Sequence, residues 1–181
     1  MPIIRAEVAI VGDSQVGKTS LINSFCGDGT KQQKQTSPTM YPELHTKKIK
    51  IPDTNYQVEL IIIDTPSHRL ALPLAARTIA ESKFLLLVIN GQDKNAQDGA
   101  RQFLSFFRDS TTIDKPKGVL VQNYSFEGNE VMNEEQLQAF GTSMGLVASR
   151  VSAQNGKDID LPFMMIAQAA YNLHKKTEQG K

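Results

Sequence analysis

The stretch IIRAEVAIVGDSQVGKTSLINSF, residues 3–25, decides the fold. Its apolar run at 3–11 predicts a strand, and the pattern at 17–25 predicts a helix. Between them, GDSQVGKT (12–19) fits G-x-x-x-x-G-K-[ST], in the strand–loop–helix context that this pattern requires. We therefore expect a phosphate-binding loop formed by Ser14, Gln15, Val16, Gly17, Lys18, Thr19 and Ser20.

The chemistry of this loop needs these residue types. Glycines let backbone N–H groups wrap an anion, and the helix N-terminus adds a partial positive charge. Lys18 can reach the β- and γ-phosphates, and the Thr19 hydroxyl can ligate Mg²⁺, which prefers oxygen ligands. Asp64 ends the strand LIIID and is suited to hold Mg²⁺ through water, although a strand-end Asp often only caps a turn.

The remaining elements alternate between strands and helices. Two strands flank the turn PDTN (52–55) and should form an antiparallel hairpin. The predicted strands after residue 25 are 44–51, 57–63, 84–89, 118–123 and 146–152, and the predicted helices are 95–108, 133–144 and 158–175. This order predicts an α/β fold in one domain, 1–181, with a mostly parallel sheet, helices on both faces and ligands at the carboxyl ends of the strands.

The composition excludes several classes of protein. The net charge of +1 gives no argument for binding nucleic acid. The one cysteine, Cys26, cannot form a disulfide within the chain, and burial as a small apolar residue is favoured over reactivity. The N-terminus has too short an apolar run for a signal peptide, and no C-terminal cysteine is present for prenylation. No direct lipid anchor to a membrane is therefore expected.

Two families of this size share the phosphate loop. Nucleoside monophosphate kinases need several arginines around the transferred phosphate, whereas Arg77, Arg101 and Arg108 are scattered over expected helices. Small GTPases have a hairpin after the first helix and a switch after the strand-end Asp. The order of elements here favours the small GTPases and leaves a P-loop nucleotide kinase as the less favoured alternative.

On these motifs the chain resembles a Rab-like small GTPase over essentially its full length. IPDTNYQVELIIIDT (51–65) and GKDIDLPFMMIAQAAYN (156–172) are most similar to the Rab-like members that serve intraflagellar transport. The resemblance implies a P-loop GTPase fold, a six-stranded sheet with one antiparallel strand pair, GTP or GDP as ligand, and Mg²⁺. It also places Thr39 at the switch position that contacts Mg²⁺ and the γ-phosphate, whereas the alternative is a solvated loop threonine.

The second switch departs from the family pattern Asp-x-x-Gly-Gln. Ser67 replaces the glycine, and Pro66 before it stiffens the approach to the γ-phosphate. His68 stands at the position of the glutamine that orients the attacking water, but imidazole has a different shape and donor pattern. We favour an exposed loop histidine over a catalytic one. Hydrolysis is therefore expected to be slow or negligible.

The base-reading motif Asn-Lys-x-Asp is also altered. Asn123 is kept, Tyr124 replaces the lysine stem that covers the base, and Phe126 replaces the aspartate that accepts two hydrogen bonds from guanine. An aromatic ring at Tyr124 can also stack on a base. Losing two charge-assisted hydrogen bonds costs about 3–6 kcal/mol, which lowers the affinity by roughly 10²–10⁴. The loss also removes the preference for guanine over adenine.

Two neighbouring features bear on the same loop. Glu127 lies one residue beyond Phe126 and restores an acceptor only if the loop changes shape. Ser152-Ala153-Gln154 is similar to the family's Ser-Ala-Lys, so Ser152 and Ala153 are candidate base contacts, with the Ala153 N–H aimed at a base oxygen.

Two hypotheses follow from these observations. The chain is either a nucleotide-binding switch with slow hydrolysis, including a Rab-type trafficking switch outside the cilium, or a degenerate GTPase fold that holds partners. The resemblance implies a place in the intraflagellar transport B complex, paired with the subunit 25 homologue, in the cytoplasm and the cilium or flagellum. We expect the second as the biological role and the first as residual biochemistry.

Overall fold

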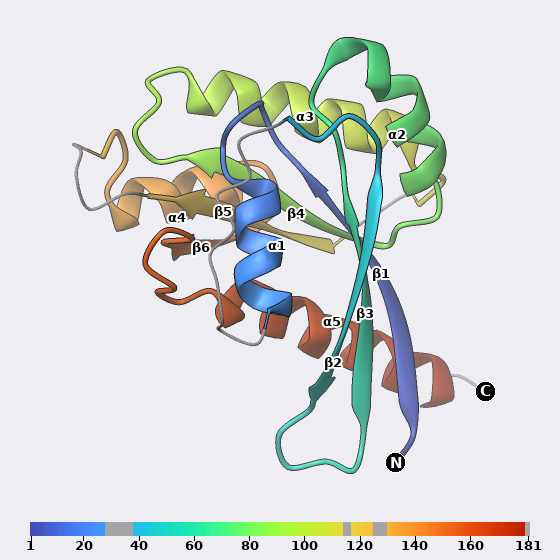
Figure 1. Cartoon of the computed structure of the whole chain (residues 1–181). Coiled ribbons are helices and arrows are strands. Elements are labelled where there is room, and N and C mark those ends of the chain that lie inside the picture. Colours follow the sequence, from blue (N-terminus) through green and yellow to red (C-terminus); the bar gives the residue numbers. More distant parts are fainter. Residues whose placement is uncertain (28–37, 114–116, 125–129, 180–181) are drawn as a thin grey trace.

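The computed structural model describes residues 1–27, 38–113, 117–124 and 130–179 (Figure 1). The strands are β1 (Ile3–Val11), β2 (Glu43–Lys50), β3 (Gln57–Asp64), β4 (Phe84–Asn90), β5 (Lys117–Asn123) and β6 (Val147–Val151). The helices are α1 (Lys18–Cys26), α2 (Leu72–Ile79), α3 (Ala96–Ser110), α4 (Glu134–Ser143) and α5 (Asp160–Gln179), with a short 3₁₀ turn, η1 (Arg69–Ala71), before α2.

The strands form one six-stranded sheet in the order β2-β3-β1-β4-β5-β6. β2 runs antiparallel to β3, and each of the other neighbouring pairs is parallel. The α/β class and the single antiparallel pair predicted above are confirmed. Because the parallel strands end at the same edge, the phosphate loop after β1, Asp64 at the end of β3 and Asn123 at the end of β5 lie along one edge of the sheet.

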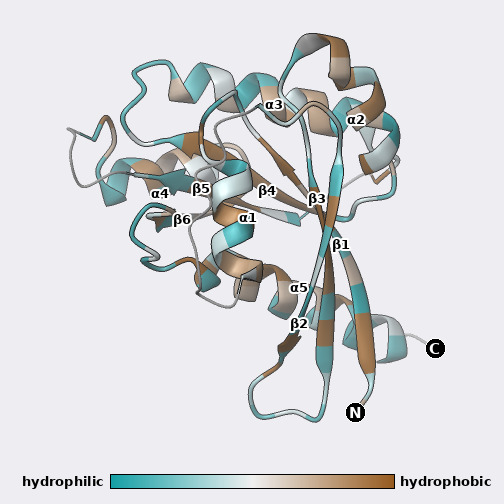
Figure 2. Cartoon of the chain, in the orientation of Figure 1, coloured by the Kyte–Doolittle hydropathy of each residue, from teal (hydrophilic) through white to brown (hydrophobic). Residues whose placement is uncertain are grey.

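The core lies in two layers, one on each face of the sheet. On one face α1 and α5 cover the strands, and the Phe25 ring stacks on Phe163 with centroids 3.8 Å apart. On the other face α2, α3 and α4 cover the strands, and Phe107 of α3 is fully buried there. Figure 2 shows the apolar residues concentrated in the central strands between these helices.

β4 explains why the sequence FLLLVI is continuously apolar. Phe84 through Ile89 are all buried, because helices cover both sides of this central strand. Burying each such side chain contributes about 1.5–3 kcal/mol. Burial therefore stabilises the sheet most at its central strands, whose carboxyl ends lead into the loops of the site.

The element boundaries differ from prediction mainly at the last helix. It begins at Asp160 rather than 158, because Asp158 has φ of +57°, outside the helical region. It continues to Gln179 rather than ending at 175, because polar side chains support its last turn: Lys175 donates to Glu178 at 2.9 Å. No helix within the described residues combines the length and the apolar character needed to cross a membrane.

Candidate nucleotide-binding site

The two glycines of the phosphate loop are required by its geometry. Gly12 has φ of +153°, and a Cβ there would lie 2.2 Å from the carbonyl oxygen of Val88. Gly17 has φ of +92°, and a Cβ there would lie 2.2 Å from Nδ2 of Asn123. A larger residue at either position would strain the backbone and collide with neighbouring strands. The spacing of the motif is therefore explained by packing as well as by phosphate binding.

Gln15 is a strained position that the sequence reasoning did not identify. Its φ is +61°, in the left-handed region that a residue with a Cβ adopts at a cost of about 1–2 kcal/mol. Strain of this kind concentrates at functional sites. The sequence hints at this strain only in that Gln15, rather than a glycine, lies in the middle of a loop that must curve around an anion.

Lys18 lies within the curve of the loop. The side chain is 6% exposed, and its Nζ donates to the carbonyl oxygens of Gly12 at 2.9 Å and Asp13 at 2.8 Å. Burial lowers the pKa of Lys18 to about 8, although the carboxylates of Asp64 and Asp13 oppose the shift. The ammonium group is therefore mostly charged at pH 7 and placed where a phosphate would sit.

Thr19, Thr39 and Asp64, the three residues predicted to hold Mg²⁺, lie close together beside Lys18. Thr19 Oγ1 donates to Asp64 Oδ2 at 2.5 Å and lies 2.9 Å from Thr39 Oγ1. Asp64 is fully buried, and its Oδ1 has no hydrogen-bond partner among the described residues. Burial raises the pKa of Asp64, and the Thr19 hydroxyl and Lys18 oppose the shift. Two hydroxyls and a buried carboxylate with an unpartnered oxygen fit a hydrated Mg²⁺ ion.

These groups open into one pocket of about 240 Å³. Its lining joins the phosphate loop to the two switch segments: Ser14, Gln15, Gly17, Lys18, Thr19, Ser20, Pro38, Thr39, Thr65 and Ser67. Six of the seven predicted phosphate-loop residues therefore meet here, together with Thr39, which was predicted to bind the metal. Val16 and Asp64 are not part of this lining: the Val16 carbonyl oxygen accepts from Asn123, and Asp64 is joined to the pocket by the hydrogen bond from Thr19.

Thr65 and Ser67 add contacts that the sequence reasoning did not foresee. Thr65 is buried, and its hydroxyl donates to the carbonyl oxygen of Ile10 at 2.7 Å, which fixes the end of β3 to β1. The Ser67 hydroxyl accepts from Lys18 Nζ at 3.4 Å. The replacement of glycine at this position therefore brings a hydroxyl group to the phosphate-binding lysine.

His68 lies outside the pocket lining and is exposed. Its Nδ1 accepts from the backbone N–H of Leu70 at 3.4 Å. His68 is thus an exposed loop histidine, the alternative favoured above. This geometry does not support a catalytic role for it, and that role stays a prediction.

On the base side, Asn123 ties three loops together. Its Nδ2 donates to the Val16 carbonyl oxygen at 2.9 Å, and its Oδ1 accepts from the Ala153 N–H at 3.0 Å. The Ala153 N–H was expected to face a base oxygen, and here it is engaged by Asn123 instead. The reason is proximity: β5 and β6 are neighbours, with Asn123 in register with Val151, so the two loop ends meet.

Ser152 is buried and serves the turn after β6. Its N–H donates to the Lys157 carbonyl oxygen at 3.0 Å, and its hydroxyl accepts from Asn155 Nδ2 at 3.2 Å. These bonds stabilise the turn in which Ala153 lies. Ser152 thus has a structural role in this geometry, and its predicted contact with a base stays a prediction.

Tyr124 is partly buried and its ring has a cationic neighbour. The guanidinium of Arg150 lies over the ring at 4.9 Å and forms ion pairs with Glu130 and Glu134. Arg150 therefore covers one face of the ring, and the predicted stacking of a base on that face would have to displace it. Phe126 and Glu127, on which the predictions of base selectivity rest, lie outside the described residues.

This combination of sheet topology, phosphate loop and strand-end Asp defines the P-loop class of small GTPases. A family model described as the Ras family matches residues 7–172, and the chain belongs to that family. Guanine nucleotide is the ligand that this family implies. The alternative of a P-loop nucleotide kinase is thereby set aside.

The similarity extends to named relatives along nearly the whole chain. The Intraflagellar transport protein 27 homolog of Mus musculus is 28% identical over 174 residues, covering 96% of this chain and 94% of the mouse protein. The Intraflagellar transport protein 27 of Chlamydomonas reinhardtii is 28% identical over 173 residues, covering 93% and 85%. The Ras-related protein Rab7 of Prunus armeniaca is 26% identical over 177 residues, covering 95% and 84%.

Proposed function

We propose that this chain is a Rab-like small GTPase of intraflagellar transport that binds guanine nucleotide weakly, or with relaxed base selectivity, and acts mainly through protein partners. The proposal treats residues 1–181 as a single domain. Its partners would be the subunit 25 homologue and the rest of the intraflagellar transport B complex, in the cytoplasm and the cilium or flagellum. The names of the animal and algal relatives support this assignment.

The observation that carries the biochemical part is the contrast between the two halves of the site. On the phosphate side, Lys18, Thr19 and Asp64 are brought together with a pocket above them. On the base side, the Ala153 N–H is already engaged by Asn123. Base contacts at Ala153 therefore compete with an existing hydrogen bond, whereas phosphate contacts at Lys18 exchange loop carbonyls for a stronger, charged acceptor.

The residues present also support a slow reaction. Mg²⁺ bound at Thr19, Thr39 and Asp64 would neutralise charge on the β- and γ-phosphates. Lys18 would orient the γ-phosphate, and the Ser67 hydroxyl would share Lys18 with it. His68 lies outside the pocket lining, so no described side chain at that position is placed to orient the attacking water.

Calorimetric titration with GDP, GTP, ADP and ATP in the presence of Mg²⁺ tests the nucleotide part. We expect measurable binding of each, with guanine favoured over adenine by less than about tenfold, and loss of all binding in Lys18→Ala. Absence of binding at high micromolar nucleotide would refute the nucleotide part, and strong selectivity for guanine would refute the relaxed selectivity.

Co-purification with the subunit 25 homologue tests the partner part separately. We expect a stable pair with the unmodified chain and with Lys18→Ala, because assembly is proposed to need no nucleotide. A homologue that fails to co-purify with the unmodified chain would count against the placement in the B complex. If the homologue co-purified with the unmodified chain but not with Lys18→Ala, assembly would instead depend on bound nucleotide.

The Rab relatives support a second candidate, a nucleotide-dependent trafficking switch outside the cilium. Plant Rab proteins match the chain over a similar share of its length. The segments at the pocket also expose apolar side chains, with Tyr41 69% and Leu70 87% exposed. A partner that binds the GTP-loaded chain and not the GDP-loaded chain would favour this candidate over constitutive assembly.

A further inference from the structure

The N-terminal half of β1 is paired on one side only. β3 pairs with β1 along its length, from Ile3 opposite Gln57 to Ile10 opposite Asp64. β4 pairs with β1 only from Val8 onward, because the chain turns at Ser82 and β4 begins at Phe84. Within the part of the chain that the structure describes, residues 3–7 therefore lie opposite no residue of another strand on the β4 side.

The backbone groups at this edge can be assigned from the pairing. Gln57 N–H donates to the Pro2 carbonyl oxygen at 3.0 Å, so Pro2 faces β3. Successive residues of a strand face opposite edges. Ile3, Arg5 and Glu7 therefore direct their N–H and carbonyl groups away from β3. The register of Val8 with Phe84 assigns the Glu7 carbonyl to the Phe84 N–H, so both groups of Ile3 and Arg5 and the N–H of Glu7 face the free edge. Such a row of groups is a template for an added strand.

A hollow of about 430 Å³ lies beside this edge. Both faces of β1 contribute to it, with Ile4 and Ala6 from the face toward α5 and Arg5 and Glu7 from the opposite face. Four consecutive residues of β1 line the hollow together with residues of α5, so it reaches from the face toward α5 to the open edge of the strand. Its apolar lining is Ile4, Ala6, Phe84, Ala170 and Leu173.

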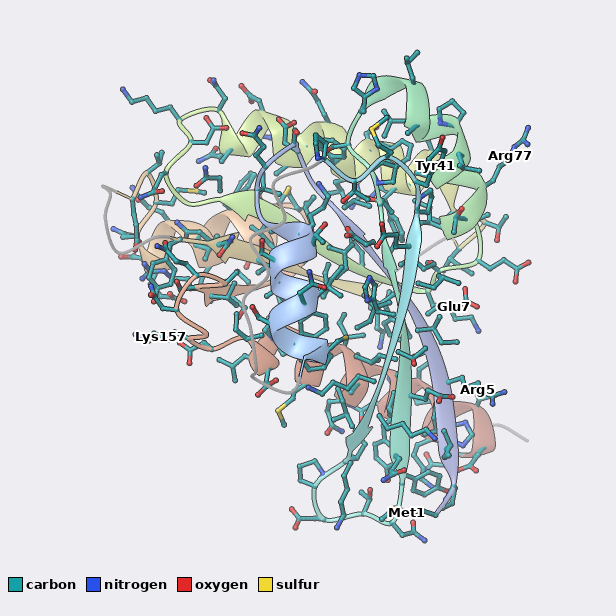
Figure 3. All side chains as sticks on the ribbon, viewed as in Figure 1. Met1, Arg5, Glu7, Tyr41, Arg77 and Lys157 are labelled. Atoms are coloured by element: carbon teal, nitrogen blue, oxygen red, sulfur yellow. The ribbon has the colours of Figure 1, made fainter. Side chains whose placement is uncertain are left out.

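The charges at the hollow favour a basic segment. Glu7 and Glu81 line it, and neither has an ion pair among the described residues. Arg5 also lines it, but its Nε is paired with Glu59 at 3.0 Å. Lys83 is the one lysine or arginine of the lining without an ion pair among the described residues. The hollow therefore has two carboxylates, Glu7 and Glu81, against one such cation. Figure 3 shows Arg5 and Glu7 along the outer side of β1.

The same charges disfavour a second copy of this chain. A symmetric antiparallel pairing of two copies centred on this edge would place Arg5 directly opposite Arg5. Like charges directly opposite each other in a sheet are destabilising. The free edge therefore suits a different protein.

We propose that residues 3–7 bind an extended segment of a partner protein by strand addition. The segment spans about five residues, at about 3.3 Å per residue, with apolar side chains directed into the hollow and basic side chains beside Glu7 and Glu81. The site needs no nucleotide, since it lies at the opposite end of β1 from the phosphate loop. It is thus independent of the nucleotide binding proposed above.

Synthetic peptides test the proposal without altering the protein. The probe is acetyl-Thr-Val-Lys-Val-Lys-Val-Thr-amide, followed by shifts of backbone amide signals in NMR spectra. We expect saturable shifts centred on Ile3, Arg5 and Glu7. Two further peptides carry N-methyl groups on their backbone amides, one at the Lys residues and the other at the Val residues. Their affinities should differ, because only one of these two sets of backbone amides faces β1. One methylated peptide should bind at least tenfold more weakly, while the other binds as the parent does.

Two other peptides and two variants complete the test. A peptide with Glu in place of Lys should bind at least tenfold more weakly to the unmodified chain and regain affinity for Glu7→Lys. Arg5→Pro and Arg5→Ala both remove the ion pair with Glu59, and only Arg5→Pro also removes the N–H at the free edge. Arg5→Pro should therefore abolish binding, whereas Arg5→Ala should bind. No shifts at millimolar peptide, or equal loss with both methylated peptides, would overturn the proposal even if Arg5→Pro failed to fold.

Discussion

Asn123 at the end of β5 donates from Nδ2 to the carbonyl oxygen of Val16 in the phosphate loop, over 2.9 Å. These residues are 107 positions apart in sequence. Through its Oδ1, the same side chain accepts from Ala153 in the loop after β6. The side-chain amide of Asn123 thus joins three loops of the site. These hydrogen bonds form within the protein and hold the loops together without a ligand.

Asn123→Ala should therefore destabilise the protein. It leaves the partly buried Val16 carbonyl and the Ala153 N–H without their partner, at a cost of about 2–4 kcal/mol. For a chain of this size we expect the melting temperature to fall by roughly 4–16 °C, measured by calorimetry without nucleotide. Asn172→Ala, on the exposed side of α5, is the control and should change it little. An unchanged melting temperature in Asn123→Ala would contradict the role of this residue.

Nucleotide affinity should fall as the pH rises above about 8. Burial lowers the pKa of Lys18 to about 8, so the free protein loses the ammonium charge above that pH. Bound phosphate raises the pKa of Lys18 in the complex, so binding above pH 8 takes up a proton. The dissociation constant of Mg²⁺–GDP should then rise about tenfold per pH unit between the two pKa values. Below pH 7 Lys18 is charged in both states and contributes no slope.

Calorimetry in two buffers of different ionisation enthalpy measures that proton uptake. Lys18→Arg is the matched control, because guanidinium stays charged over this range and should remove the uptake. A dissociation constant that stays level from pH 7 to pH 10, with no proton uptake, would show that Lys18 does not hold the phosphate.

Asp64→Asn should remove the stabilisation by Mg²⁺–GDP. At a hundredfold excess over its dissociation constant, ligand binding contributes about 2.7 kcal/mol, or roughly 5–10 °C in melting temperature. Burial raises the pKa of Asp64, so its charge is unfavourable in the free protein. In EDTA the variant should therefore be at least as stable as the parent. The difference should shrink as the pH falls toward the ordinary value of 3.8, where Asp64 gains a proton.

Asp53→Asn makes the same chemical change far from the site, in the turn between β2 and β3. Asp53 has φ of +55°, which asparagine also tolerates, so this control should keep the full response to Mg²⁺–GDP. If Asp64→Asn were stabilised by Mg²⁺–GDP as much as Asp53→Asn, Asp64 would have no part in holding the metal.

The fold could be predicted because its signals are local and repetitive. The continuous apolar run at β4 follows from burial on both faces, and the PDTN turn sets the β2–β3 hairpin. The glycine spacing of the phosphate loop likewise reflects backbone conformations that other residues resist, at Gly12 and Gly17. The sequence therefore predicts the sheet and the order of its elements, and it identifies the residues of the phosphate loop.

The rest of the site depends on contacts between distant side chains. The bond from Lys18 to Ser67 spans 49 positions and the bond from Thr65 to Ile10 spans 55. No periodicity encodes such pairs, because each depends on where two loops meet and which rotamer is chosen. The engagement of the Ala153 N–H by Asn123 was missed for that reason, although both residues had been singled out from motifs.

Phe126→Asp should restore selectivity for guanine. The sequence aligns Phe126 with the aspartate that accepts two hydrogen bonds from guanine, and adenine lacks the groups that donate them. Each such charge-assisted bond contributes about 1.5–3 kcal/mol, so GDP affinity should rise by roughly 10²–10⁴ while ADP affinity stays near its starting value. Phe126→Asn, of the same size but without charge, should give a smaller gain. Calorimetric titration of both nucleotides measures the ratio. Equal affinities for GDP and ADP in Phe126→Asp would mean that this loop does not present residue 126 to the base, and the relaxed selectivity would then need another cause.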